Sequence, residues 1–360
     1  MQERETSSAV RVLYVSGREP TYVRVALVLR ALRANYQVIE ITSAARSMSR
    51  RLVEVSAKLL LRRPQYDIAV AGFFGQPLVP LLKKLSPKPI VFDAFVSAYD
   101  TLCFDRKVAC PSSPIGKAAY WLDKSACSQS SRIVADTQAH AQYFGRTFDV
   151  SQKKITKLYL GYDNSVFFPR EKTLSGPFQV FFYGTFLPLH GIEYIVKAAK
   201  LVQKETDIRF LIVGKGRAHS SVRQLANDLS AHNIEFVDWI PYEKLPKTIS
   251  NSSICLGGHF SNSEKAKRVI AGKTYQFLAM EKPTIVGDCA ANKELFRHEE
   301  HVIMCEQANE YALADAILKL KREEELCDHI ARNGRELVDS LFNNDVVEEN
   351  LRKIIELAIH

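Results

Sequence analysis

Several features that mark specialised classes of protein are missing from this chain of 360 residues. Its seven cysteines are odd in number and form no Cys-x-x-Cys pair, so neither a disulfide framework nor a zinc site is supported. No run approaches the roughly 18 apolar residues of a membrane-spanning helix. Residues 1–8 lack the basic and then apolar pattern of a signal peptide. We therefore expect reduced thiols and a cytoplasmic protein.

Sequence repeats of about 20–50 residues are also missing, so we do not expect a solenoid fold. What the chain has is 46% apolar and 25% charged residues, the composition of a soluble globular protein. Its length suggests two domains of ordinary size. A formal net charge of +9 favours anionic partners, namely nucleotide phosphates, an anionic membrane face or nucleic acid. Nucleic acid is disfavoured because the basic residues are not interleaved with aromatic ones.

Short apolar segments alternate with segments of helical spacing along both halves of the chain. This alternation predicts α/β architecture with parallel sheets and crossover helices. A polar stretch at 170–177 reads as a linker between the halves. The strands expected in the first half are residues 11–16, 36–41, 67–73, 89–92, 131–135 and 155–160. Those expected in the second half are residues 178–183, 208–213, 234–237, 254–256, 284–286 and 302–304.

A helix expected at residues 45–63 has a marked basic side. Arg51, Lys58 and Arg62 fall near one face by their spacing. One interpretation is the exposed face of a helix that packs on the core. The other is a surface that rests on anionic lipid headgroups.

Carboxylates follow the fourth expected strand. Asp93, Asp100 and Asp105 come just past its end, where ligands collect in doubly wound sheets. Carboxylates at such a place bind sugar hydroxyls or act as a base. The alternative for each of them is turn or capping chemistry.

A second candidate site lies in the stretch 265–288. Lys273 begins a short helix that ends before Pro283, a buried strand follows at 284–286, and Asp288 stands in the turn after it. Backbone N–H groups and the helix dipole would favour a phosphate at this helix N-terminus. The alternative is an ordinary buried helix with solvated lysines. A further strand-to-helix turn at Gly214-Lys215-Gly216 suits close approach of a ligand, but it lacks the third glycine of the dinucleotide fingerprint.

Five motifs of the second half occur in one order: F-F-Y-G-T-F-L-P-L-H-G, F-L-I-V-G-K-G, F-V-D-W-I-P-Y-E-K-L-P, K-T-Y-Q-F-L-A-M-E-K-P-T-I-V-G-D and N-K-E-L-F. This order resembles group 1 (family 4) glycosyltransferases of the GT-B fold, over about residues 161–340. The resemblance implies two Rossmann-like domains facing across a cleft. Residues 1–168 would bind the acceptor, 177–342 would bind the nucleotide-sugar donor, and the helix at 343–360 would cross back to the first domain.

The resemblance also implies the chemistry. The donor would be a nucleotide-diphospho-sugar that serves as substrate, with no separate cofactor and no metal, and the sequence contains no Asp-x-Asp. Transfer in this family is generally retaining, through an oxocarbenium-like transition state. The acceptor would be a saccharide or a lipid-linked saccharide, as in bacterial surface polysaccharide assembly. The basic first domain leaves open peripheral attachment to the inner membrane face.

The family's pair of glutamates, eight positions apart, is replaced here by Arg268 and Gln276. We expect Arg268 and Lys273 to hold the donor diphosphate, since Arg forks match phosphate geometry. Gln276 would contact the ribose through hydrogen bonds. The remaining donor residues expected from the resemblance are Gly184, Thr185, Gly214, Asp288 and Glu294.

The same comparison assigns roles to the other candidates. Catalytic groups are expected among Asp93, Asp100, Asp105 and His190, the three aspartates facing the acceptor. The alternative for His190 is a purely structural role. The alternative for the donor candidate Asp288 is a role in the turn. Glu294 would orient a lysine or cap its own helix. Because both family glutamates are replaced, a non-catalytic binding subunit is the alternative to an enzyme.

Overall fold

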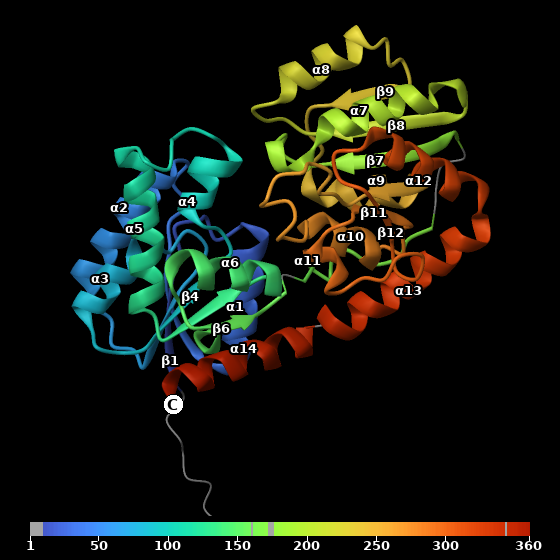
Figure 1. Ribbon diagram of the computed structural model, residues 1–360. Coiled ribbons are helices and arrows are strands. Elements are labelled where there is room, and N and C mark those ends of the chain that lie inside the picture. The colour runs from blue at the N-terminus through green and yellow to red at the C-terminus, as the bar shows by residue number, and fades with distance from the viewer. Residues whose placement is uncertain (1–9, 160, 172–175, 343) are drawn as a thin grey trace, which may run out of the picture.

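The chain forms two α/β domains and a long C-terminal helix (Figure 1). The computed structural model describes residues 10–159, 161–171, 176–342 and 344–360. Residue 160, at the end of one expected strand, and residues 172–175 of the expected linker lie outside this description.

The first domain has a six-stranded parallel sheet in the order β2-β1-β3-β4-β5-β6. This confirms the parallel sheet predicted from the alternating pattern. Its buried central strands are continuous apolar runs because helices cover both faces. The strands are β1 Arg11–Val15, β2 Gln37–Ile41, β3 Ile68–Ala71, β4 Ile90–Asp93, β5 Arg132–Ala135 and β6 Ile155–Lys157.

Among the described residues, helices of this domain begin at side-chain caps in four places. Each cap accepts a hydrogen bond from the backbone N–H three residues on, and the caps are Ser47, Ser97, Ser113 and Thr137. The segment after β4, which carries Asp100 and Asp105, is helical. The helices are α1 Val23–Asn35, α2 Met48–Arg62, α3 Leu78–Leu85, α4 Ala98–Asp100, the π-helix η1 Thr101–Asp105, α5 Pro114–Gln129, α6 Gln138–Phe148 and the 3-10 helix η2 Gln152–Lys154.

The basic side of α2 differs from the expectation. Arg51 is buried, and its guanidinium donates to the carbonyl oxygens of Gly17 and Ala45. Lys58 donates to the Thr42 carbonyl oxygen at 2.8 Å. The prediction of a solvated face was therefore wrong for Arg51, because helical spacing does not show which neighbouring loops cover a side chain.

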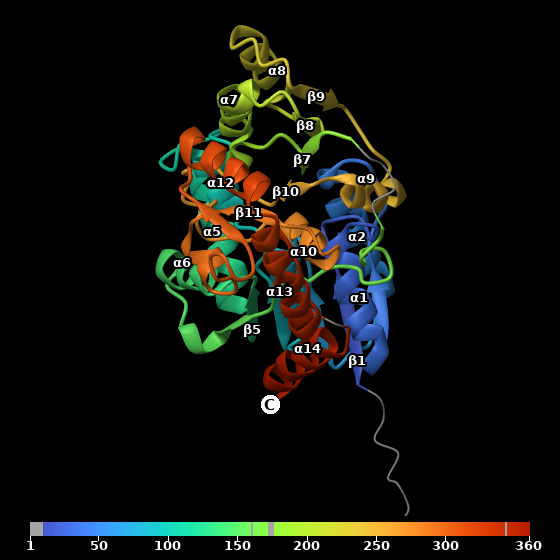
Figure 2. The same ribbon diagram turned by 90° about the vertical axis from the view of Figure 1, so that its right-hand side faces the viewer.

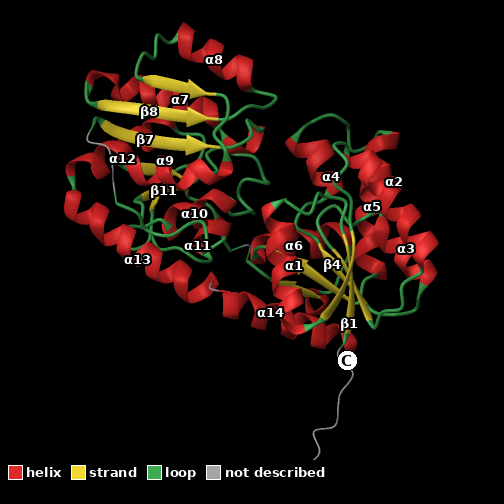
Figure 3. Cartoon of the chain, turned by 180° about the vertical axis from the view of Figure 1, so that it is seen from behind, coloured by secondary structure: helices red, strands yellow, loops and turns green. Residues whose placement is uncertain are grey.

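The second domain has a parallel sheet in the order β12-β11-β10-β7-β8-β9. The chain runs outward from β7 through β8 and β9, then returns to β10 on the other side. This reversal is a topological switch point, and the arrowheads of β7 and β8 point toward the first domain (Figure 3). The strands are β7 Phe178–Tyr183, β8 Ile208–Val213, β9 Ile234–Val237, β10 Ile254–Leu256, β11 Thr284–Gly287 and β12 Ile303–Cys305.

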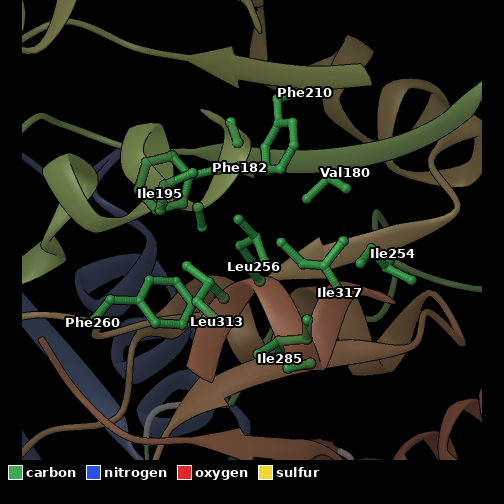
Figure 4. Packing of buried hydrophobic residues seen from close by; sticks show 14 of the residues in the cluster. Val180, Phe182, Ile195, Phe210, Ile254, Leu256, Phe260, Ile285, Leu313 and Ile317 are labelled. Carbon is green, nitrogen blue, oxygen red and sulfur yellow. The ribbon is translucent and has the colours of Figure 1, made fainter. Parts of the chain in front are cut away.

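Alternation along β7 buries both faces of this sheet. Val180 and Phe182 join one apolar cluster (Figure 4), whereas Phe181 and Tyr183 pack in the cluster on the other side. The covering helices are α7 Ile192–Leu201, α8 His219–Asp228, α9 Leu245–Asn251, α10 Gly272–Ala279, α11 Ala290–Lys293, α12 Glu310–Arg322 and α13 Glu324–Phe342. Three short 3-10 helices complete the domain, η3 Pro188–His190, η4 Val202–Lys204 and η5 Tyr242–Lys244.

The last helix, α14 Asn344–Ile359, leaves the second domain and packs on the first (Figure 2). Leu351, Ile354 and Ile355 join Val25 and Leu29 of α1 in one buried cluster. The returning helix expected from the resemblance is confirmed. Within the described ranges, no helix combines the length and the apolarity that a bilayer crossing requires.

Candidate active site

The candidate donor site lies at the switch point of the second sheet. Gly184 directly follows β7, and His259 follows β10, the neighbouring strand. The N-terminus of α10 contributes Lys273 beside them. Ligands of doubly wound sheets bind at such a point, outside the carboxyl ends of the strands.

Lys273 is a buried lysine for which the described part of the chain supplies no counter-ion. Its side chain is only 8% exposed, and Nζ has no hydrogen-bond partner in the described part of the chain. Nζ lies 4.1 Å from the centroid of the Phe182 ring. Burial lowers the pKa of Lys273 from its usual value to about 7. An anion bound here would restore the charged form.

Two histidines lie beside this lysine. The rings of His190 and His259 stack with centroids 5.4 Å apart and planes inclined by 8°. Nδ1 of each ring is buried without a hydrogen-bond partner among the described residues. Burial, followed by the charge of Lys273, lowers the pKa of both rings well below the ordinary value. Both imidazoles are therefore neutral at pH 7 and free to hydrogen-bond a ligand.

Gly184 leaves the space that a ligand needs. A Cβ at this position would lie 3.0 Å from Lys273 Nζ and 3.2 Å from His190 Cε1. The backbone at Gly184 has φ of 155°, which L side chains rarely adopt. Gly214 follows the adjacent strand β8 with φ of 141°. Lys273 and His190 thus lie beside bare backbone at Gly184, with His259 stacked on His190, an arrangement that suits a phosphate group.

The other donor candidates have mixed surroundings. Gln276 lies one turn beyond Lys273 on α10, and its Oε1 accepts a hydrogen bond from the Tyr183 hydroxyl. Thr185 is exposed next to Gly184. Asp288 pairs with Lys293 Nζ at 2.5 Å, close to the turn after β11. Gln276 shares helix α10 with Lys273, and Thr185 directly follows Gly184, which lies beside Lys273.

Arg268 reaches across to the first domain. Its Nη2 lies 2.8 Å from Asp100 Oδ1, and its guanidinium lies 3.9 Å from the centroid of the Tyr143 ring. Its carbonyl oxygen accepts a hydrogen bond from the Thr137 hydroxyl. The structure therefore pairs one expected donor residue with one expected acceptor residue.

Two further sets of polar contacts join the domains. Lys265 Nζ lies 3.1 Å from Asp105 Oδ2 and 3.0 Å from Thr101 Oγ1. The Glu294 carboxylate accepts hydrogen bonds from the backbone N–H groups of Gln138 and Ala139, each at 2.7 Å. A carboxylate at the N-terminus of α6 is favoured by the helix dipole. Of the two roles expected for Glu294, the cap falls on a helix of the other domain and not on its own, and a lysine, Lys157, lies 3.9 Å from its carboxylate.

Asp93 is occupied by a buried ion pair. Its two oxygens accept from Arg24 Nε at 2.8 Å and Arg24 Nη2 at 2.7 Å, and both residues are buried. The Arg24 guanidinium also lies 4.4 Å from the centroid of the Phe95 ring. The three expected catalytic aspartates are therefore all paired with a cation.

Sequence reasoning missed His259 and Lys265. The pair Gly257-Gly258 after an expected strand is a signal that would have drawn attention to His259. Lys265 carried no local signal, because its partner Asp105 is 160 residues away along the chain. The described residues include no group of three or more His, Cys, Asp or Glu side chains placed to hold a metal ion.

Comparison with known proteins adds a family and a set of similar structures. The family model "Glycosyl transferases group 1" matches residues 177–323, and no curated protein matches the chain. Sucrose-phosphate synthase from Thermosynechococcus elongatus is similar with a TM-score of 0.80 at 14% identity, over 96% of this chain and 98% of that one. Anabaena Alr3699/HepE, solved with UDP and glucose, has a TM-score of 0.74 at 13% identity, over 96% and 99%.

A third similar structure is a point mutant of S. aureus TarM, solved with fondaparinux, alpha-GlcNAc-glycerol and UDP. Its TM-score is 0.65 at 13% identity, over 84% of this chain and 59% of that one. At these identities the structures establish the fold, and the matched residues establish the family of the second domain. The second domain therefore matches the group 1 glycosyl transferases over residues 177–323, and the chain as a whole has the GT-B fold.

Proposed function

We propose that this glycosyltransferase takes its sugar from a uridine-diphospho-sugar bound at the Lys273 site. The single observation that carries this proposal is the buried, unpaired ammonium group of Lys273. A buried charge without a partner is costly, and a diphosphate would supply the missing charge. UDP is the proposed nucleotide because HepE and TarM were solved with it.

The proposed reaction breaks the bond between the anomeric carbon and the diphosphate oxygen. The acceptor oxygen forms the new bond on the same face of the sugar, and its proton passes to the leaving diphosphate. Lys273 and the N-terminus of α10 would stabilise the charge that develops on the leaving group, without a metal. His190 and His259 would donate or accept hydrogen bonds from the sugar or phosphate. Gln276, held by Tyr183, would contact the ribose.

The proposed acceptor is a lipid-linked saccharide at a membrane surface, as in surface polysaccharide assembly. Its support is the outer side of α2, which exposes cations and apolar side chains together. Val53 is 69% exposed and Leu61 is 85% exposed, beside the exposed Arg50, Arg62 and Arg63. Such a surface binds the interface of an anionic membrane, with Leu and Val among the headgroups.

The donor proposal is tested by thermal unfolding and turnover with a panel of nucleotide-diphospho-sugars. A donor present at 100 times its dissociation constant should stabilise the native state by about 2.7 kcal/mol. We expect stabilisation by UDP-sugars and turnover of at least one of them, and Lys273→Met should lose both. Binding without hydrolysis or transfer would favour the non-catalytic subunit, and no binding of any nucleotide would contradict the proposal.

The membrane proposal is tested by co-sedimentation with vesicles. The wild type should bind vesicles that contain anionic phosphatidylglycerol and not neutral phosphatidylcholine vesicles. Val53→Gln with Leu61→Gln should weaken this binding, whereas Leu201→Gln, an exposed leucine of the second domain, serves as the matched control. Equal binding by the double variant would contradict a role for α2.

A further inference from the structure

A cavity of about 350 Å³ opens in the first domain, apart from the Lys273 site. Its walls come from the loops after β1 and β3, the start of α2, the α4–η1 segment and one position of α5. Thr101, which lines the cavity, also binds Lys265 of the second domain at 3.0 Å. The cavity therefore abuts the interface between the domains.

Four arginines line this cavity, and none of its lining residues is a carboxylate. Arg51 is fixed, since it donates to backbone oxygens and lies 3.0 Å from Glu19. Arg18 lies with its guanidinium 4.7 Å from the centroid of the Tyr22 ring. Its Nε is buried without a hydrogen-bond partner in the described part of the chain, and the Glu19 carboxylate is 3.7 Å away.

The other two arginines are exposed at the cavity. Arg46 and Arg106 show no ion pair to a carboxylate within the described ranges. Arg18, Arg46 and Arg106 thus present donors that no protein group fully satisfies. An arginine fork of this kind matches the geometry of a phosphate.

The remaining wall is mostly apolar, with Gln76 and Thr101 as its polar side chains. Leu52, Phe74, Leu102 and Leu122 line it, together with Met48, which is 43% exposed. Phe104 and Trp121, close in the chain to the lining residues Leu102 and Leu122, are large apolar side chains that are also exposed. Exposed apolar groups that continue from a cavity indicate a ligand that extends beyond it.

We propose that this cavity binds the phosphate that joins lipid to saccharide in a lipid-linked acceptor, with the first part of the lipid chain on its apolar wall. The phosphate contacts Arg18, Arg46 and Arg106, and the chain lies along Met48, Leu102 and Leu122. This inference rests on the proposed function, and it names the residues that recognise the acceptor. The apolar lining beside the arginines, with Met48 43% exposed at the cavity, favours a lipid phosphate over a small soluble one.

The test is calorimetric binding of dodecyl phosphate, below its critical micelle concentration, to the full chain. Inorganic phosphate and dodecyl maltoside are the comparison ligands, and UDP is titrated into the same preparations. Dodecyl phosphate should bind at least about tenfold more tightly than either comparison ligand. Arg106→Gln should weaken its binding about tenfold or more, by loss of a charge-assisted contact. Met48→Gln should reduce the ratio between the affinity for dodecyl phosphate and the affinity for inorganic phosphate.

Arg322→Gln is the matched control, an exposed arginine on α12 of the second domain whose change should leave dodecyl phosphate binding unaltered. Both cavity variants change exposed side chains and should keep wild-type UDP affinity. Equal binding of dodecyl phosphate and inorganic phosphate, equal binding of dodecyl maltoside, or an unaltered Arg106→Gln variant would each overturn the inference. Absence of UDP binding in the wild type would instead overturn the proposed donor site.

Discussion

The two domains use buried charge in opposite ways. In the first domain, Asp93 lies in a buried bidentate pair with Arg24, and Asp100 pairs with Arg268 across the interface. In the second domain, Lys273 is also buried but has no ion-pair or hydrogen-bond partner in the described ranges. A buried charge with a built-in partner holds the fold together, whereas one without a partner indicates the place of a ligand. Position at a strand end alone does not separate the two cases.

The largest effect on stability should come from breaking the buried ion pair between Asp93 and Arg24. Asp93→Asn keeps the size of the side chain but leaves the buried Arg24 guanidinium without a counter-charge. Removing one partner of a buried pair costs about 3–5 kcal/mol of unfolding free energy, measured by urea denaturation. The control is Asp67→Asn, whose pair with Arg11 is partly exposed and should matter much less. Equal losses in the two variants would contradict a structural role for Asp93.

Substitution of Lys273, the buried charge without a partner in the described ranges, should change stability in the opposite direction. Lys273→Met removes a buried ammonium group, so the ligand-free protein should gain stability at low pH. The folded-state pKa of Lys273, about 7, lies below the unfolded value of about 10.4. The folded state therefore binds fewer protons between these values, and wild-type stability should rise with pH in this window relative to the variant. Urea denaturation from pH 6 to pH 10 measures the difference, and a constant difference would contradict the assignment.

A smaller effect is expected at the interface between the domains. Arg268→Gln and Asp100→Asn should be coupled by about 1 kcal/mol in a double-mutant cycle of unfolding free energy, because the side chains contact each other. UDP affinity should change by less than about fivefold in Arg268→Gln, since the Arg268 guanidinium is engaged by Asp100 and the Tyr143 ring. Loss of UDP binding comparable to that of Lys273→Met would return Arg268 to the role expected from the sequence.

The sequence predicted what depends on local pattern. Alternating apolar segments predicted two parallel sheets, and Lys273 at a helix start predicted the anion site that the unpaired nitrogens now support. The partner of Arg268 could not be predicted, because Asp100 lies 168 residues away and meets it only when the domains pack. The burial of Arg51 depends in the same way on a loop that contributes the Gly17 carbonyl. Long-range packing decided which charges were satisfied.

The central claim is that the charged form of Lys273 binds the donor diphosphate. The most direct test is the UDP affinity of the wild type and of Lys273→Met between pH 6 and pH 9, measured by calorimetry. Because Lys273 has a pKa of about 7 in the ligand-free protein, the affinity of the wild type for UDP should fall as pH rises above this value, at most about tenfold per pH unit. The variant should bind weakly with no such decline. Wild-type affinity that stays constant to pH 9, or matches that of the variant, would contradict the account.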